Sequence, residues 1–385
     1  MKITHVIAAL TKGGAERVVV DLANVSSAAA HKVTIVVAYP VDAVLLQNAL
    51  SSNVQLLQIQ PEKKSALKIY LSLIPWVWAN RNWLRGQDVL HFHLTLGAIM
   101  ATLCWFMFRW KYPRPIIVET NHSIGVYIKK WQRYLFWLTA RWRDGYVLMA
   151  EDNEWQTHLK KSSMPLMQFI PNGVDLPQIT FELSARRAVR SNIGLPDYPH
   201  LVVGTVGRMA AERNPVAMIE TFAKIVFHLK GLAKVHFLMA GAGPEMDVVR
   251  RRVAALGLID LVTLPGLVID SRSVMSIMDL YLTMNVGVTT GVAGLEAATQ
   301  GIPVIAIQMQ SDHRLGATDW IWSSNSPDEV AREAVKILLD HRMRTELADA
   351  QRQYAIENFS AQKMASRYVD FYKKTQAAFR LKSGF

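Results

Sequence analysis

Short hydrophobic runs recur along the 385-residue chain, and stretches with helical spacing of apolar and polar residues separate many of them. Runs of this length that alternate with helices are typical of buried strands in a parallel, doubly wound sheet. The predicted strands lie at 3–10, 32–38, 54–59, 88–92, 116–119, 145–150, 168–170, 201–206, 235–240, 262–266, 279–283, 304–307 and 318–322. Helices are predicted at 17–26, 295–299, 327–338, 341–359 and 360–379. The fold class is therefore α/β.

A charged and irregular segment with two prolines interrupts this alternation near the middle of the chain. Because such segments favour loops between domains, we place a linker at 179–200. It would join a first domain at 1–178 to a second at 201–360, and a helical segment would follow at 361–385. The chain is long enough for two domains, each with its own hydrophobic core.

One unit of strand, loop, helix and strand, at 279–305, has a chemistry that suits a ligand. Asp279–Thr283 is an apolar strand, and a small, polar, glycine-rich loop follows it. Leu295–Thr299 opens a helix that Gly301 and Pro303 would end. Free backbone N–H groups at such a helix start form an anion site, which suits phosphate.

Glu296 lies in the predicted first turn of that helix. The helix dipole favours a carboxylate at this position, and the same carboxylate could accept hydrogen bonds from the hydroxyl pair of a sugar. A glutamate that caps the helix of an ordinary α/β unit explains the residue equally well. Both interpretations stand when the unit is considered alone.

Two arginines follow the first strand of the second domain. Arg208 stands directly after Gly207, and Arg213 lies five residues further on. Cations beside a glycine-ended strand can neutralise a departing nucleoside diphosphate, although two surface arginines would give the same pattern. The later loop Gly241–Pro244 is similar to a dinucleotide-binding loop, but Met246 stands where the third glycine belongs.

Histidines stand near the ends of two predicted strands in the first domain. His91 and His93 belong to one strand end, and His122 follows the next strand. Ligands gather at the carboxyl ends of the strands in doubly wound sheets. Three histidines could also bind zinc, whereas structural hydrogen bonds are the stronger interpretation of His91 and His93.

The order of residues at 279–305 resembles the donor-binding signature of retaining GT-B glycosyltransferases, the large family 4 that includes bacterial mannosyl- and N-acetylhexosaminyltransferases. The matching residues are Asp279, Asn285, Gly291, Leu295-Glu296-Ala297 and Gly301-Ile302-Pro303-Val304-Ile305. Further similarities are Pro171-Asn172-Gly173-Val174-Asp175, the pair Gly207-Arg208 and Arg213. The chain departs from the family at Val288, where the first glutamate of the motif belongs, and at Thr289-Thr290, which replace Gly-Phe.

The resemblance implies a GT-B fold, in which two Rossmann-like domains face each other across a cleft and the segment 361–385 crosses back to the first domain. It also implies transfer of a sugar from a nucleotide diphosphate donor to an acceptor hydroxyl. The anomeric configuration would be retained, and neither a metal nor another cofactor would be needed.

The resemblance also assigns roles to residues. Arg208 and Arg213 would stabilise the departing diphosphate, and Glu296 would hold the donor ribose. His122, which lies in a Thr-Asn-His context as in the family, would orient the donor sugar. These four are the predicted catalytic residues. The residues implied in nucleotide-sugar binding are Gly13, Gly14, Gly207, Gly243, Thr290, Gly291 and Val292.

The chain is basic, with a formal net charge of +12, and the charge is concentrated in its first half. Residues 1–180 carry 19 Lys/Arg and 11 Asp/Glu, a balance of +8. Such a surface suits a membrane, a phosphate-bearing acceptor or nucleic acid, or is simply solvated. Cys104 is the only cysteine, which excludes an intramolecular disulfide and a cysteine metal site and favours the cytosol. The opening MKITHVIAAL predicts a strand rather than a signal peptide.

Three aromatic and basic stretches favour a membrane surface among these partners, although packing in the first domain explains them equally well. They are Ile69–Trp83, Leu94–Trp110 and Tyr127–Arg143. Each is too short or too interrupted for a confident membrane span, so we expect interfacial helices or helices of the first core. The interfacial interpretation predicts a peripheral protein on the inner face of the cytoplasmic membrane, with an anionic membrane surface and a lipid-linked glycan of O-antigen, capsule or exopolysaccharide synthesis as partners. No nucleic acid partner is expected.

Other functions remain open at this point. The replacements at 288–290 suit a non-catalytic GT-B protein that binds a sugar nucleotide or glycan, or that is a scaffold. A nucleotide-sugar epimerase or a phosphorylase could use the same fold. A dehydrogenase is disfavoured by the broken glycine fingerprint at Gly241–Pro244.

Overall fold

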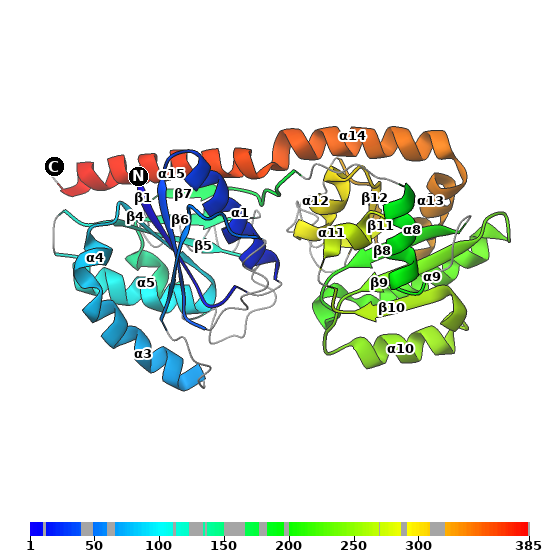
Figure 1. Cartoon of the computed structure of the whole chain (residues 1–385), viewed down its shortest axis with the longest axis horizontal. Helices are drawn as coiled ribbons and strands as arrows, with labels where there is room; N and C mark the ends of the chain where they lie inside the picture. The colour runs from blue at the N-terminus through cyan, green and yellow to red at the C-terminus, as the bar shows by residue number, and fades with distance from the viewer. Residues whose placement is uncertain are drawn as a thin grey trace. The chain divides into compact units, whose positions relative to one another are not determined.

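We describe a computed structural model of the chain (Figure 1). The described residues are 1–10, 13–39, 49–59, 66–110, 113–122, 134, 137–149, 166–176, 183–195, 200–268, 270–285, 291–308 and 320–383. The chain folds into two compact units. The first combines Met1–Asp175 with Ala361–Phe385, and the second is Leu176–Ser360.

The first unit is built on a parallel sheet whose described strands number seven, in the order β3-β2-β1-β4-β5-β6-β7. Their bounds are Lys2–Ile7 (β1), Lys32–Val37 (β2), Gln55–Gln58 (β3), Val89–His93 (β4), Ile116–Asn121 (β5), Gly145–Leu148 (β6) and Leu166–Phe169 (β7). The helical elements are Gly14–Ala28 (α1), Ala66–Ala79 (α3), Arg81–Arg85 (α4), Leu94–Phe108 (α5), Ala140–Trp142 (η1) and Ala361–Ser383 (α15).

Helices cover both faces of this first sheet (Figure 1). α3, α4 and α5 pack on one face, with Phe92 and Leu96 in the core between them and the strands. α1 and α15 lie against each other, and α15 also contacts β5 and β7. α5 is apolar on nearly all sides because it is a core helix, with Met100 and Cys104 fully buried.

A buried ion pair fixes α5 to the sheet in the first unit. Arg143 Nε donates to Glu119 Oε2 over 2.6 Å, and the two side chains are 0% and 2% exposed. The guanidinium also donates to the Ala98 and Thr139 carbonyl oxygens. A buried charge is tolerated only when it is paired and hydrogen-bonded in this way.

The second unit has a six-stranded parallel sheet among its described residues, in the order β10-β9-β8-β11-β12-β13. The strands are Leu201–Val206 (β8), Val235–Ala240 (β9), Val262–Gly266 (β10), Leu280–Asn285 (β11), Val304–Gln308 (β12) and Ser323–Ser324 (β13). The helical elements are Leu183–Asn192 (α8), Ala211–Arg213 (η2), Pro215–Leu229 (α9), Met246–Ala255 (α10), Ile259–Leu261 (η3), Ser271–Met275 (α11), Gly291–Thr299 (α12), Pro327–Leu339 (α13) and His341–Phe359 (α14).

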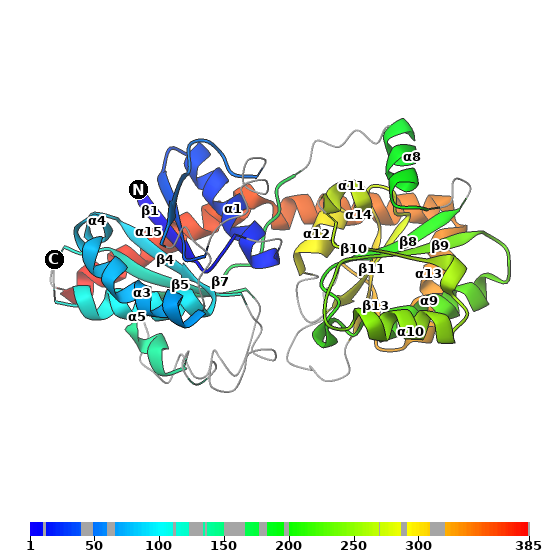
Figure 2. The ribbon, with the colours of Figure 1, turned by 60° about the horizontal axis from the view of Figure 1, so that its bottom comes forward.

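Two hydrophobic layers enclose the second sheet (Figure 2). One layer joins the strands to α9, α10 and α13 around Phe222, Phe237 and Ile337. The other joins them to α8, α11, α12 and α14 around Tyr281 and Ala297. Together with the first unit, this arrangement confirms the predicted fold class of two Rossmann-like α/β domains.

The structure corrects the sequence prediction in three places. The region predicted as the linker, 179–200, contains α8, whose Arg190 is buried and donates to the His200 carbonyl oxygen. Residues 320–322 of the predicted strand 318–322 are not a strand, residues 318 and 319 lie outside the described residues, and the strand found next to them is Ser323–Ser324. The stretch Ile69–Trp83, described above as short or interrupted, contains most of α3, and this helix continues through Pro75 because a helix that packs well tolerates the loss of one backbone hydrogen bond.

Candidate functional site

A pocket in the second unit lies at the carboxyl end of β8 and the neighbouring β11. Its lining residues come from β8, from β11, from the segment that joins β8 to α9 and from the first turn of α9. They are Thr205, Val206, Gly207, Arg208, Met209, Arg213, Pro215, Met218, Tyr281, Thr283 and Met284. Two predicted catalytic arginines therefore share one pocket, at the edge of a parallel sheet where ligands gather.

Close backbone packing shapes one side of this pocket. A Cβ on Gly241 would lie 1.8 Å from the Gly207 carbonyl oxygen, and one on Gly243 would lie 2.1 Å from that of Met209. Backbone hydrogen bonds join the same segments, from Gly207 N to Ala240 O and from Met209 N to the Ala242 carbonyl oxygen. Gly243, which stays a predicted nucleotide-sugar-binding residue, packs here against the segment that carries the two arginines.

A strained turn sets the position of Arg213. The residue ends the short 3₁₀ helix η2, and Asn214 follows in a left-handed conformation with φ of 36°. The Asn214 side chain caps α9 by accepting from the Ala217 N–H over 3.3 Å. Asparagine tolerates this backbone conformation better than most residues do, and its cap offsets part of the cost.

Arg213 also faces the start of α12. Its Nη1 lies 3.7 Å from where a Cβ on Gly291 would stand, and Gly291 is the first residue of that helix. Arg208 belongs to the same segment, is exposed and lines the same pocket. Two guanidinium groups and a helix N-terminus therefore bring positive charge to one place, which is the arrangement that binds phosphate.

Glu296 differs from its predicted setting. α12 begins at Gly291 rather than at Leu295, so the glutamate lies in the second turn and the helix dipole does little for it. It is 8% exposed, and its Oε1 lies 3.7 Å from Arg272 Nε. The prediction failed because the low helix propensity of glycine at 291 and 294 hid the first turn, which packing stabilises.

Tyr281 is a lining residue that the sequence analysis missed. Its hydroxyl donates to the Val206 carbonyl oxygen over 3.0 Å and lies 3.2 Å from the Val206 N–H, so it fastens β11 to the end of β8. Burial raises the pKa of this phenol, and the neighbouring Arg213 opposes the shift. A tyrosine within an apolar strand gave no signal of this role.

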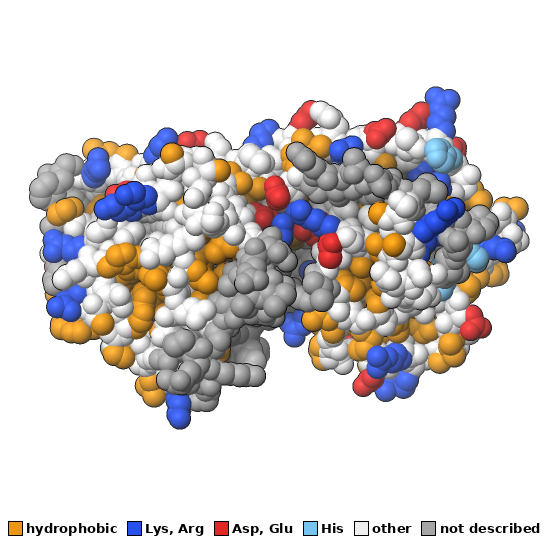
Figure 3. Space-filling view, viewed as in Figure 1, with side chains coloured by type: hydrophobic (Ala, Val, Ile, Leu, Met, Phe, Trp, Pro, Cys, Tyr) orange, Lys and Arg blue, Asp and Glu red, His pale blue; other side chains and the backbone are white. Residues whose placement is uncertain are grey.

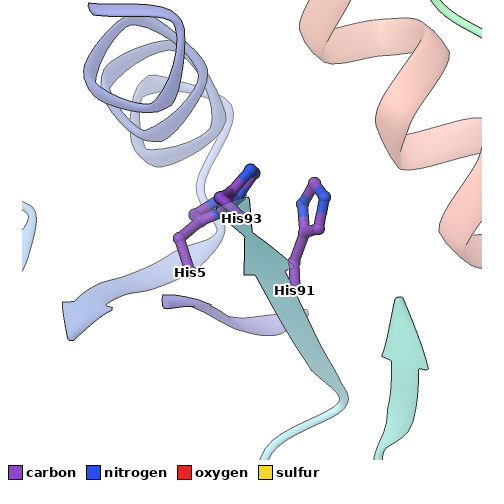
Figure 4. A group of neighbouring side chains, drawn as sticks. All are labelled: His5, His91 and His93. Carbon is purple, nitrogen blue, oxygen red and sulfur yellow. The ribbon is translucent and has the colours of Figure 1, made fainter. Parts of the chain in front are cut away.

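The predicted histidines of the first unit do gather, and a fourth joins them. His5, on β1, is paired in the sheet with His91 on β4. His5 Nδ1 lies 3.2 Å from His93 Nε2, and His93 Nδ1 lies 2.9 Å from His122 Nε2. Figure 4 shows the rings of His5, His91 and His93. The sequence offered one clue to His5, a titratable side chain between the apolar residues Ile3, Val6 and Ile7 of the strand.

His91 has the structural role that was expected of it. Its Nδ1 lies 2.7 Å from the Tyr372 hydroxyl, and its Nε2 lies 2.7 Å from the Thr120 hydroxyl. Tyr372 comes from α15, and Tyr368 of the same helix lies 3.1 Å from the Thr120 hydroxyl. The last helix is therefore tied to the first sheet by polar contacts as well as by packing.

The remaining predicted residues are distributed as follows. Gly13 precedes α1, Gly14 is its first residue, and the Glu16 carboxylate folds back over Gly13. Val292 lies in the first turn of α12. Thr290 and the replacements at 288 and 289 lie outside the described residues. His122, Gly13 and Gly14 belong to the first unit, whereas the two arginines, Glu296 and α12 belong to the second.

Two Rossmann-like α/β units are the architecture of the GT-B class of proteins, and the second unit carries a pocket with two arginines at its strand ends. Family models agree: residues 12–178 match "Glycosyltransferase Family 4", and residues 200–340 match "Glycosyl transferases group 1". The two matches together cover most of the chain. The chain therefore belongs to the group 1, family 4 glycosyltransferases, and the resemblance found in the sequence is confirmed.

Individual relatives are distant. An alpha-monoglucosyldiacylglycerol synthase of Streptococcus pneumoniae is 28% identical over 36% of this chain and 31% of its own length. A GDP-mannose-dependent alpha-(1-6)-phosphatidylinositol monomannoside mannosyltransferase of Mycobacterium tuberculosis is 23% identical over 55% of this chain and 57% of its own. These alignments span only about a third to three fifths of the relatives.

The fold has solved counterparts. The crystal structure of Anabaena HepE in complex with UDP and glucose matches with a TM-score of 0.75 and 17% identity, over 96% of this chain and 98% of the other. None of the helices in the described residues is long and apolar enough to cross a membrane.

Proposed function

We propose that this protein is a retaining glycosyltransferase that moves a sugar from a nucleotide diphosphate donor to an acceptor hydroxyl. The observation that supports this most is the meeting of Arg208 and Arg213 at one pocket of the second unit, with the start of α12 beside the Arg213 guanidinium. Group transfer from a nucleotide sugar releases a diphosphate, and this is where its charge would be stabilised.

The chemistry follows from that placement. As the bond from the anomeric carbon to the phosphate oxygen breaks, negative charge grows on the departing diphosphate, and the two guanidinium groups stabilise it. The acceptor oxygen attacks the face that the leaving group vacates and passes its proton to a phosphate oxygen. Glu296 holds the ribose and His122 orients the sugar. No enzyme nucleophile is required for this step. The positive charge that stabilises the departing diphosphate comes from the protein.

The donor can be identified by binding. We expect one nucleotide sugar from a panel of UDP- and GDP-linked sugars to raise the unfolding temperature and to bind in calorimetry, because only one base and sugar should fit the pocket fully. The same compound should then release its nucleoside diphosphate when an acceptor extract is added. A folded protein that binds no member of the panel would contradict the proposal and favour a scaffold role.

The acceptor is proposed to be a lipid or lipid-linked glycan at the inner face of the cytoplasmic membrane. The names of the two relatives above refer to a diacylglycerol glycolipid and a phosphatidylinositol mannoside. In this chain, one face of α3 buries Ile69, Leu73 and Val77 in the core, yet the outer face of the helix is also apolar. Exposed helix faces are normally polar, so this one suits an apolar environment.

The outer face of α3 carries Leu71, Ile74 and Trp78, which are 62%, 59% and 61% exposed. Arg81 stacks its guanidinium 4.9 Å from the centre of the Trp78 ring, and Lys68 is exposed on the same helix. Figure 3 shows hydrophobic side chains gathered on this part of the first unit. Aromatic and aliphatic groups beside cations are typical of helices that lie in a headgroup layer.

We therefore expect the protein to sediment with anionic phospholipid vesicles at low salt. Replacement of Ile74 and Trp78 together by serine should weaken this binding about tenfold or more, since two large apolar side chains no longer enter the membrane. Phe227→Ser is a matched control, because Phe227 is 72% exposed on α9 of the second unit. Equal sedimentation of both variants, or none of the parent protein, would contradict a membrane role for α3.

A further inference from the structure

Three histidines of the first unit are joined in series. His5 Nδ1 contacts His93 Nε2 at 3.2 Å, and His93 Nδ1 contacts His122 Nε2 at 2.9 Å. His5 and His93 are 0% and 1% exposed, whereas His122 lies just after β5, at the carboxyl edge of the sheet. The series therefore runs from the interior of the sheet to the edge where a ligand would bind.

Burial favours the neutral form of each of these three rings. Burial lowers the pKa of His5 to about 3 and that of His122 to about 4, and burial with neighbouring histidines lowers the pKa of His93 well below its usual value. A neutral imidazole has one N–H donor and one acceptor nitrogen. In a series of such rings, every hydrogen bond must therefore be donated in the same direction.

The two ends of the series decide that direction. His5 Nε2 and His122 Nδ1 are both buried and have no partner among the described residues. If the three histidines donated toward His5, the Nε2–H of His5 would have no acceptor in the centre of the sheet, where an unpaired donor is costly. If they donate toward His122, His5 keeps an unused acceptor and the free N–H comes to the sheet edge.

We propose that His5 and His93 are positioning residues that hold His122 as an Nδ1–H donor. His5 Nδ1–H donates to His93 Nε2, and His93 Nδ1–H donates to His122 Nε2, so the His122 tautomer and ring orientation are both set from inside the sheet. The remaining N–H of His122 donates to an oxygen of the bound sugar. The contact with the sugar rests on the proposed function, whereas the hydrogen bonds among the three histidines do not.

A metal is the competing explanation of this cluster. Among the described residues, His5, His91 and His93 bring ligand nitrogens within 4.8 Å of one another. However, both nitrogens of His91 already contact the hydroxyls of Tyr372 and Thr120, and no carboxylate belongs to the group to balance a dication. The contacts favour neutral rings, and metal content is one readout of the experiment.

The test is the tautomeric state of each histidine, read from long-range ¹⁵N–¹H spectra of ¹⁵N-histidine-labelled full-length protein without substrate. We expect His5, His93 and His122 to be neutral at pH 7 and to carry the proton on Nδ1. Signals are assigned by single substitutions. His236→Gln is the control for a buried histidine elsewhere, since His236 contacts Thr263 in the second unit.

Two variants of His5 separate positioning from packing. His5→Asn keeps an amide N–H where Nδ1 stood and should preserve the His122 tautomer, whereas His5→Leu removes the donor and should let His122 populate both tautomers. With a donor identified, His5→Leu should lower kcat about tenfold, the effect of one hydrogen bond, with little change in the donor KM, and His5→Asn should restore it.

Three results would overturn the proposal. The first is a His122 that is protonated on Nε2 or on both nitrogens in the parent protein, and the second is a His122 tautomer that stays unchanged in His5→Leu. The third is stoichiometric zinc in the parent protein that is lost in His91→Ala. None of them depends on turnover. An inactive protein with the expected tautomers would instead contradict the proposed transferase function and leave the histidine chain intact.

Discussion

Arg213→Ala is expected to lower kcat/KM for sugar transfer a hundredfold to a thousandfold, about the loss seen when one preorganised donor to a developing negative charge is removed. The effect should be this large because Arg213 is held before any ligand arrives. η2, the left-handed Asn214 and the capped start of α9 fix its backbone, and its guanidinium faces the first residue of α12.

A series of substitutions separates charge from geometry. Arg213→Lys keeps the charge but loses the planar fork, so it should recover part of the activity. Arg208→Ala should cost less by itself, because that side chain is exposed and water weakens its contribution. The double alanine variant should no longer bind the free nucleoside diphosphate, which calorimetry measures directly.

Arg332→Ala is the matched control for this series. Arg332 is 65% exposed on α13 and pairs with Asp328 one turn away, so its loss should leave both transfer and binding unchanged. If Arg213→Ala retained full kcat/KM while the control behaved as expected, the pocket at the end of β8 would not be the place where the diphosphate leaves.

The sequence predicted this pocket because its signals are local. Gly207-Arg208 and Arg213 follow one strand directly, so they had to reach the carboxyl edge of the sheet once the strand was identified. The glycine and proline after α12 ended that helix as expected: Gly301 takes a positive φ of 75°, and Ile302 N donates to Ala297 O.

The features that could not be predicted from the sequence depend on contacts between distant segments. His5 meets His93 only because β1 and β4 are neighbours in a sheet whose order differs from the order along the chain. Tyr281 reaches Val206 for the same reason. The early start of α12 reflects packing that overrides the poor helix propensity of glycine.

The histidine cluster should also make the first unit sensitive to mild acid. In the folded chain His5, His91 and His93 are buried, and burial is the largest cause that lowers the pKa of each; for His5 it lowers the pKa to about 3. In the unfolded chain a histidine takes up a proton near pH 6.5. Below that pH the unfolded state binds more protons than the folded state, so stability falls as the pH falls.

The expected loss is substantial. Between pH 7 and pH 5.5 each of the three residues should lower the free energy of unfolding by about 1.3 kcal/mol, or about 4 kcal/mol together. Most carboxylates are still ionised over this range, so their contribution is small. Denaturant titrations followed by tryptophan fluorescence can measure the loss, because nine of the 11 tryptophans belong to the first unit.

His5→Asn provides the internal control for this pH dependence. It removes one of the buried groups while keeping a polar contact to His93, so the loss between pH 7 and pH 5.5 should shrink by about 1.3 kcal/mol, the contribution of that one group. Urea midpoints that stay constant over that range in the parent protein would mean that the histidines take up protons in the folded state. Charged rings could not donate in series to one another, so the same result would also remove the basis for a neutral chain ending at His122.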